Sequence, residues 1–123
     1  MLSSIDCACK GANFDKMLQP SILLVLYKQD MHGFALVNEL GANSMFNGNP
    51  PDKAGVYRYL KKMEEAGLLT SYLSEETAEA RKKRIYSITD EGRYCLLNWY
   101  RAMEDYVKSL NGLITDICDA ING

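Results

Sequence analysis

Apolar residues recur every three or four positions in four segments of the chain, which is the spacing of helices that bury one side. These segments predict helices over Leu18–Lys28, Phe34–Leu40, Lys53–Ala66 and a long stretch that follows Thr89. Pro20 is compatible only with the first turn of a helix, so regular helix is expected to begin near Leu18. The segment Met31-His32-Gly33 is predicted to be a turn, and the Asn-, Gly- and Pro-rich segment Ala42–Pro51 a loop.

The third and fourth helices carry clear start signals. Asp52 is a good N-cap for the third helix, and Gly67 ends it with a residue that adopts positive φ at low cost. The buried stripe of this helix is predicted to consist of Val56, Leu60 and Met63. Thr89 is the expected N-cap of the last helix, because the two acids that follow it suit the positive end of a helix dipole.

Two short runs, Leu68–Leu73 and Arg84–Thr89, are rich in β-branched, aromatic and aliphatic residues and predict strands. The polar segment Ser74–Lys83 between them predicts a β-hairpin with a long tip. The fold class is therefore mainly α with a small β-hairpin, in the element order of a winged helix-turn-helix domain followed by a long helix. We expect an N-terminal arm over residues 1–15, a winged-helix DNA-binding domain over 16–89 and a C-terminal dimerisation helix over 90–123.

Apolar residues of the last helix repeat in alternating steps of four and three, which is the heptad pattern of a coiled-coil contact. This pattern predicts a homodimer that pairs through Leu96, Tyr100, Met103, Val107, Leu110, Ile114, Ile117 and Ile121. Trp99 lies beside this seam. The aromatic residues here are typical of core and dimer packing.

Composition and charge narrow the function. The 123 residues fit one domain, and no apolar run is long enough to cross a membrane. The N-terminus does not read as an export signal, so we expect a cytoplasmic protein with reduced cysteines. The formal net charge is −2, yet cations gather in two places. One cluster lies on the third helix and the other at the hairpin tip: Lys53, Arg58, Lys61 and Lys62, and then Arg81, Lys82, Lys83 and Arg84.

The third helix is suited to the major groove of DNA, which admits an α-helix between walls of phosphate. Opposite its buried stripe it would expose Lys53, Tyr57, Arg58, Lys61 and Lys62. The basic tip, Arg81 to Arg84, would reach the neighbouring backbone, so that phosphate contacts position the module while helix side chains read bases. Taken alone, the cluster on the third helix is more typical of a solvated helix face than of a binding surface, and the basic tip is equally compatible with a solvated hairpin. The order of the elements favours the DNA-binding interpretation.

Three stretches together carry a resemblance to PadR-type regulators. They are Gln19–Leu26 followed by Met31-His32-Gly33-Phe34, then Gly55–Leu60 through Met63–Leu69, and then Arg81–Gly92. The resemblance covers about Leu18 to Leu97. It implies a dimeric DNA-binding regulator with one C-terminal dimer helix, most often a repressor released by a small, often aromatic, molecule. The resemblance also suggests an aromatic lining for such an effector between the subunits, for which Trp99 and Tyr100 are the candidates. Departures from the pattern are Phe34 in place of Tyr, Arg58 in place of Pro, and an acidic tip without glycine over Ser74–Ala80.

Other interpretations stay open beside this one. The net negative charge favours a winged-helix protein-interaction module that binds no DNA. Cys7 and Cys9 are spaced like two metal ligands, which suits a thiol- or metal-sensing regulator, although two ligands are too few for a site. His32, the single histidine, is expected to be a turn residue bonded to backbone. Since the chain carries no P-loop and no nucleophile motif, we expect neither an enzyme nor a cofactor.

Overall fold

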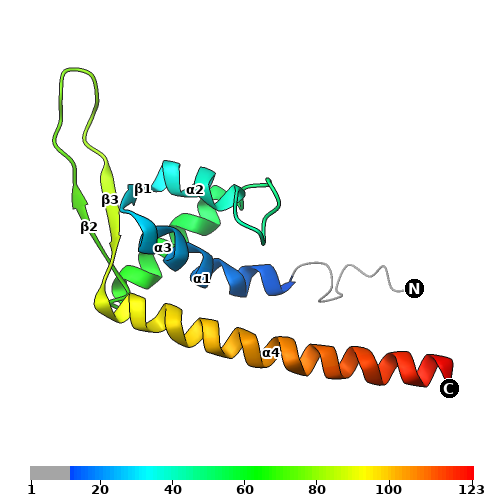
Figure 1. Ribbon diagram of the computed structural model, residues 1–123. Coiled ribbons are helices and arrows are strands. Elements are labelled where there is room, and N and C mark those ends of the chain that lie inside the picture. The colour runs from blue at the N-terminus through cyan, green and yellow to red at the C-terminus, as the bar shows by residue number, and fades with distance from the viewer. Residues whose placement is uncertain (1–11) are drawn as a thin grey trace.

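The computed structural model describes residues 12–123 and, from Met17 onward, their side chains. Within this range the chain forms helices and one small antiparallel sheet, with a long final helix below them (Figure 1). In chain order the elements are α1 (Ala12–Lys28), β1 (Met31–His32), α2 (Gly33–Gly41), α3 (Lys53–Glu65), β2 (Leu69–Leu73), β3 (Arg84–Ile88) and α4 (Asp90–Asn122).

Helix α1 begins at Ala12, six residues before the predicted start, so Pro20 lies inside the helix. The expectation of a start near Leu18 is wrong, and the helix extends into the segment that was assigned to an arm. Proline lacks an N–H and removes one helical hydrogen bond. The apolar side of α1 is buried against the core from Leu18 onward, and the Ser21 hydroxyl donates to the Met17 carbonyl at 2.8 Å. Tertiary packing thus outweighs the local preference at Pro20.

The sheet has one strand more than the predicted hairpin. Its order is β1-β3-β2, and β3 pairs with both neighbours in antiparallel fashion. Met31 lies opposite Tyr86, so the first two residues of the segment predicted as a turn form a short strand, and its third residue, Gly33, begins α2. His32 is also the N-cap of α2, with φ −80° and ψ 161°. An N-cap residue adopts extended backbone, which is the conformation that a strand needs, and this allows the same residue to pair with β3.

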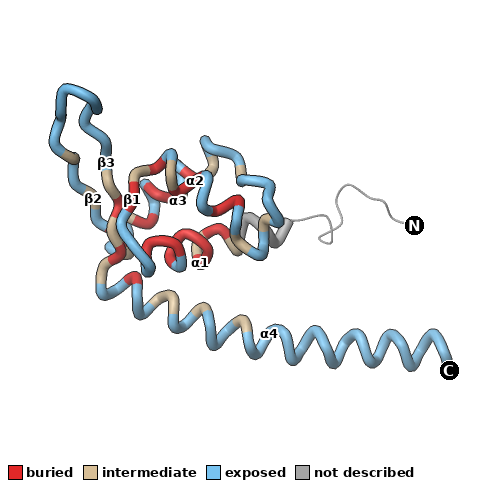
Figure 2. The backbone as a smooth tube through the Cα atoms, turned by 45° about the horizontal axis from the view of Figure 1, so that its top comes forward, coloured by how far each residue is buried: buried red, intermediate tan, exposed pale blue. Residues whose placement is uncertain are grey.

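The core lies between the first three helices and one face of the sheet (Figure 2). Val56, Leu60 and Met63 of α3 are buried, as predicted, and they meet Leu69 of β2 in the same cluster. Helix α3 ends before Gly67, whose φ of 82° confirms the expected stop. The strand and helix limits of α2, α3, β2 and β3 agree with the prediction to within one residue at each end.

Helix α4 packs on the core only through its first turns. Thr89 caps it, because its hydroxyl oxygen accepts from the Gly92 N–H at 3.0 Å and donates to the Gly67 carbonyl at 2.7 Å. Half-buried Cys95, Leu96 and Trp99 then pack against the core. Beyond half-buried Met103, α4 extends away from the other elements and is exposed (Figure 2). Among the described helices, none is long and apolar enough to span a bilayer.

Candidate nucleic-acid interface

Helix α3 presents its polar side to solvent directly opposite its buried stripe. The Asp52 carboxylate accepts from the Gly55 N–H at 3.1 Å and fixes the start of the helix, as predicted. Lys53, Tyr57, Arg58, Lys61 and Lys62 are all exposed. A helix anchored by one apolar stripe and cationic on the other side has the charge distribution that phosphate-lined grooves attract.

The start of α2 adds aromatic side chains next to this face. The Lys53 ammonium lies 5.4 Å from the centre of the Phe34 ring, which is 57% exposed. The Tyr57 ring lies so close to Gly33 that any side chain at Gly33 would overlap it. Sequence reasoning treated Phe34 only as a departure from a pattern. In the structure it lies beside the first turn of α3, with the Lys53 ammonium over its ring.

The wing is an ordered hairpin that extends from the sheet. The Ser74 N–H donates to the Lys83 carbonyl at 2.8 Å, and the Lys83 N–H donates to the Ser74 hydroxyl at 2.9 Å. At the tip, Thr77 and Ala80 close a turn through two further hydrogen bonds. All side chains from Glu75 to Arg84 are exposed. The acidic residues of the wing therefore lie in its first half and at its tip. The cations lie in its second half, which leads back into β3 and the core.

Arg84 differs from the other wing cations because it is held in place. Its Nη1 donates to the Ser71 hydroxyl at 2.9 Å, and that hydroxyl donates to the Glu64 carboxylate at 2.7 Å. This chain of hydrogen bonds joins the base of the wing to the last turn of α3. Burial, and next the nearby Glu64 carboxylate, raise the pKa of Tyr86, so its hydroxyl stays protonated at neutral pH.

The structure brings one residue of the predicted α3 interface beside two cations of the wing, whereas the four cations of α3 do not line the same cavity. Tyr57 of α3 and Lys83 and Arg84 of the wing line one cavity with His32, which sequence reasoning did not assign to the interface. His32 is bonded to backbone as predicted, because its Nδ1 accepts from the Ala35 N–H at 3.3 Å. No local sequence signal could have found it, because the residues that line the cavity with His32 come from elements far apart in the chain.

The two candidate effector residues point to different surroundings. Tyr100 lines a largely apolar cavity of about 680 Å³ between α1, the segment after α2, and α4. Trp99 is not among the lining residues; its indole N–H donates to the Gln19 side chain at 2.8 Å and holds α4 on α1. Sequence reasoning missed Tyr27 and Arg93, which also line the cavity, with the guanidinium 5.4 Å from the ring centre.

Most of the predicted dimer seam is unpartnered within one chain. Leu96 and Met103 are half-buried against the core side of α4. The remaining members have between 40% and 76% of their surface exposed: Tyr100, Val107, Leu110, Ile114, Ile117 and Ile121. An apolar stripe of this length on a protruding helix is typical of a surface that another chain covers.

The cysteines do not assemble a metal site in the part of the chain that the structure describes. Cys7 and Cys9 lie outside the described residues. Cys95 is half-buried, and burial raises the pKa of its thiol, whereas Cys118 is exposed on α4. Packing was expected for both, and it is seen for Cys95 but not for Cys118. Within residues 12–123 no group of three potential ligands comes together.

A three-helix core, a basic wing and a long final helix define the class of winged-helix transcriptional regulators. A PadR family transcription regulator from Clostridium difficile is similar in structure, with 24% identity and a TM-score of 0.70 over 79% of this chain and 97% of that chain. The sequence model of the transcriptional regulator PadR-like family matches residues 22–97, more than half of the chain. The protein belongs to this family, which confirms the resemblance seen in the sequence.

Two further solved structures show the same fold. A transcriptional regulator from Clostridium thermocellum has a TM-score of 0.73 at 20% identity, over 82% of this chain and 93% of that chain. Bacillus subtilis PadR, solved in complex with operator DNA, has a TM-score of 0.58 at 23% identity, over 68% of this chain and 45% of that chain. No curated protein matches the chain at a significant level.

Proposed function

We propose that this regulator binds operator DNA with α3 in the major groove and the wing on the neighbouring backbone. The observation that carries the proposal is the exposed cationic side of α3, set opposite a fully buried stripe, on a helix whose Tyr57 shares a cavity with Lys83 and Arg84 of the wing. Lys53, Arg58, Lys61 and Lys62 would contact phosphates and base edges, and Arg81 to Lys83 would contact the backbone. The operator complex of Bacillus subtilis PadR supports this role.

The proposal includes a homodimer formed through α4. Two copies of the exposed seam would cover each other and place two α3 helices on one side of the assembly. A dimer of this kind binds a roughly two-fold symmetric operator, with half-sites about 10 base pairs or a multiple apart. The dimer would repress transcription by occupying a promoter.

Release by a small effector is the remaining part of the proposal. The cavity of about 680 Å³ lies where α1 meets α4, and it is lined mainly by apolar side chains, Tyr100 among them. A planar aromatic molecule bound there would change the angle of α4 and hence the spacing of the two α3 helices. Trp99 is the only tryptophan and lies one residue from Tyr100, so its fluorescence should report binding. A compound that quenches Trp99 yet leaves operator affinity unchanged would contradict this mechanism.

DNA binding is tested by fluorescence anisotropy with a duplex from the region upstream of the protein's own gene, over a range of salt concentrations. Affinity should fall steeply with salt, and Lys61→Ala should lower the slope of log K against log salt by about one. Lys108→Ala, on exposed α4, is the matched control and should keep the wild-type slope. Equal slopes for both variants would refute the placement of α3. Absence of binding at low salt would favour the protein-interaction module.

A further inference from the structure

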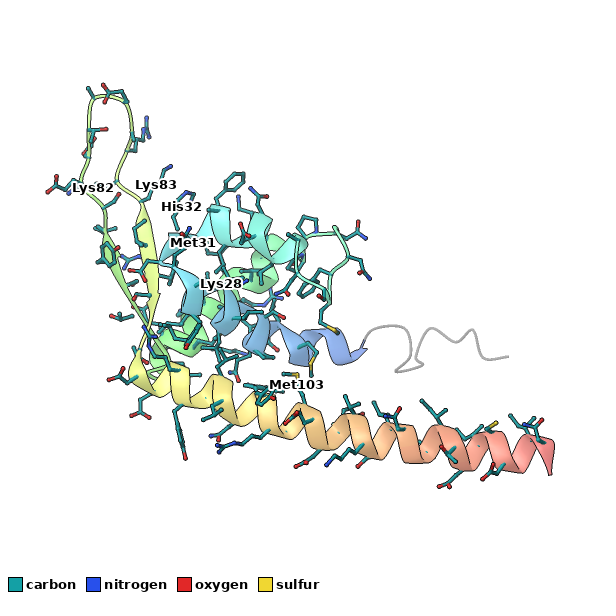
Figure 3. The ribbon with its side chains drawn as sticks, in the orientation of Figure 1. Lys28, Met31, His32, Lys82, Lys83 and Met103 are labelled. Carbon is teal, nitrogen blue, oxygen red and sulfur yellow. The ribbon has the colours of Figure 1, made fainter. Side chains whose placement is uncertain are left out.

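A second cavity, of about 380 Å³, lies where three elements meet: the junction of β1 with α2, the exposed side of α3, and the base of the wing. Its lining includes His32, Gly33, Tyr57, Lys83 and Arg84. Figure 3 shows His32 and Lys83 beside each other at this junction. Among the residues that the structure describes, the lining contains two cations, an imidazole and two phenols but no acid, although the chain as a whole carries a net negative charge.

His32 lines this cavity, and one of its ring nitrogens is engaged by the backbone of α2. Its Nδ1 accepts from the Ala35 N–H, so Nδ1 carries no proton. The neutral imidazole then holds its proton on Nε2, which is left to donate. The helix cap therefore fixes both the tautomer and the ring, and no ordering of the side chain is needed when a ligand arrives.

The other donors are also held before binding. Gly33 leaves room for the Tyr57 ring, which packs directly against it. Arg84 is tied to Ser71 at 2.9 Å through Nη1, and this contact fixes its guanidinium at the wall of the cavity. The backbone of Lys83 is held by its two hydrogen bonds with Ser74 at the base of the wing, and its side chain is exposed. Preorganised N–H and O–H donors with nearby positive charge form the chemistry that binds a phosphate group.

We propose that this cavity binds one phosphate of the DNA backbone, with His32 and Tyr57 donating hydrogen bonds and Lys83 and Arg84 supplying charge. The inference rests on the proposed DNA binding and assigns a function to His32, which the α3 and wing contacts alone do not use. The position fits, because the cavity lies between the helix proposed for the groove and the wing proposed for the backbone beside it. Free inorganic phosphate has the same chemistry as a backbone phosphate, and the experiment below distinguishes these two ligands.

His32 is the only histidine of the chain, so its ring resonances are identified without assignment. We would record them by NMR while titrating the full chain either with the upstream duplex or with inorganic phosphate, and follow duplex binding by anisotropy in the same samples. The ring signals should shift in step with duplex binding. Anisotropy that reports binding while the ring signals stay fixed would overturn the cavity but leave the DNA-binding function intact. Absence of duplex binding would overturn both.

The phosphate titration distinguishes the two sources. Saturable shifts with inorganic phosphate, together with none on duplex binding, would make the cavity a small-molecule site and overturn its assignment to DNA. Shifts with the duplex, and only weak, unsaturated shifts with phosphate, support the proposal, since the backbone phosphate is delivered by contacts elsewhere.

A variant separates the proposed contact from the structural role of His32. In His32→Asn the shorter side chain still caps α2, because Asn is among the best N-cap residues, but the ring N–H is lost. Duplex affinity should fall about threefold to tenfold, the cost of one hydrogen bond, with the salt slope unchanged. Lys83→Gln should instead lower that slope by about one, while Lys108→Gln should not. Wild-type affinity for a folded His32→Asn protein would overturn the proposal.

Discussion

The contact between α4 and the sheet makes a sharp prediction about two glycines of the same helix. A Cβ built on buried Gly92 would overlap the carbonyl oxygen of Leu68 and lie 2.7 Å from Cγ1 of Ile88. The first obstacle is backbone and cannot rotate away, so Gly92→Ala must displace the start of α4. We expect a loss of about 1–3 kcal/mol in the free energy of unfolding, the usual cost of overpacking a tight contact.

Gly112→Ala is the matched control, because the same substitution at this position should change the free energy of unfolding in the opposite direction. Gly112 is exposed in mid-helix, and a Cβ there would meet nothing within 4 Å. It also lies on the side of α4 opposite the seam around Leu110 and Ile114. Replacing a mid-helix glycine by alanine removes an entropic cost, so Gly112→Ala should raise the free energy of unfolding by about 0.5–1 kcal/mol.

Urea unfolding followed by circular dichroism, at one fixed protein concentration, measures both variants. The concentration must be held constant because association would make the apparent stability depend on it. The difference between the two alanine variants should be at least about 1.5 kcal/mol, from the sum of the two effects. A Gly92→Ala protein as stable as the wild type would show that α4 does not sit this close to Leu68, and the reasoning would fail.

Three further outcomes follow from the structure. Ile114→Asp should weaken self-association at least about tenfold in sedimentation experiments, because a charge would enter the apolar seam, while neighbouring Thr115→Asp should not. Thr89→Ala should lower the free energy of unfolding by about 1–2 kcal/mol in the same urea assay, because two hydrogen bonds at the start of α4 are lost. A loss of stability no larger than that of an exposed surface substitution would contradict this. Iodoacetamide at mildly alkaline pH should alkylate exposed Cys118 before Cys95, whose raised pKa lowers its thiolate fraction, as peptide mass spectrometry would show; faster reaction at Cys95 would refute its burial.

Periodicity and end signals were enough to predict most of the fold. Asp52, Gly67 and Thr89 act locally, through backbone groups within a few residues, and each does in the structure what its type favours. The α3 stripe follows from spacing alone. The identity of the family could also be predicted, because three short patterns occurred in the right order.

The features that escaped prediction depend on contacts distant in sequence. Pro20 lies inside α1 because the helix is buried on the core. Met31 becomes part of a strand only because Tyr86 lies beside it. The sequence could not show that Trp99 and Tyr100 have different surroundings. The hydrogen bond that places Trp99 on α1 joins it to Gln19, which is far away in the chain. The cavity around His32 likewise draws on three elements that no local pattern connects.

The placement of the apolar stripe on α4 also bears on how the protein is made. In the described part of the chain, the buried apolar core lies between Leu18 and Ile88, and the exposed part of the stripe comes after it. Because synthesis is vectorial and domains fold as units, the core can close before the stripe leaves the ribosome. Neighbouring nascent chains on one messenger RNA therefore do not expose an unfolded core and the apolar stripe of α4 at the same time. The concentration of completed protomers, rather than crowding on a polysome, would decide when two α4 helices meet.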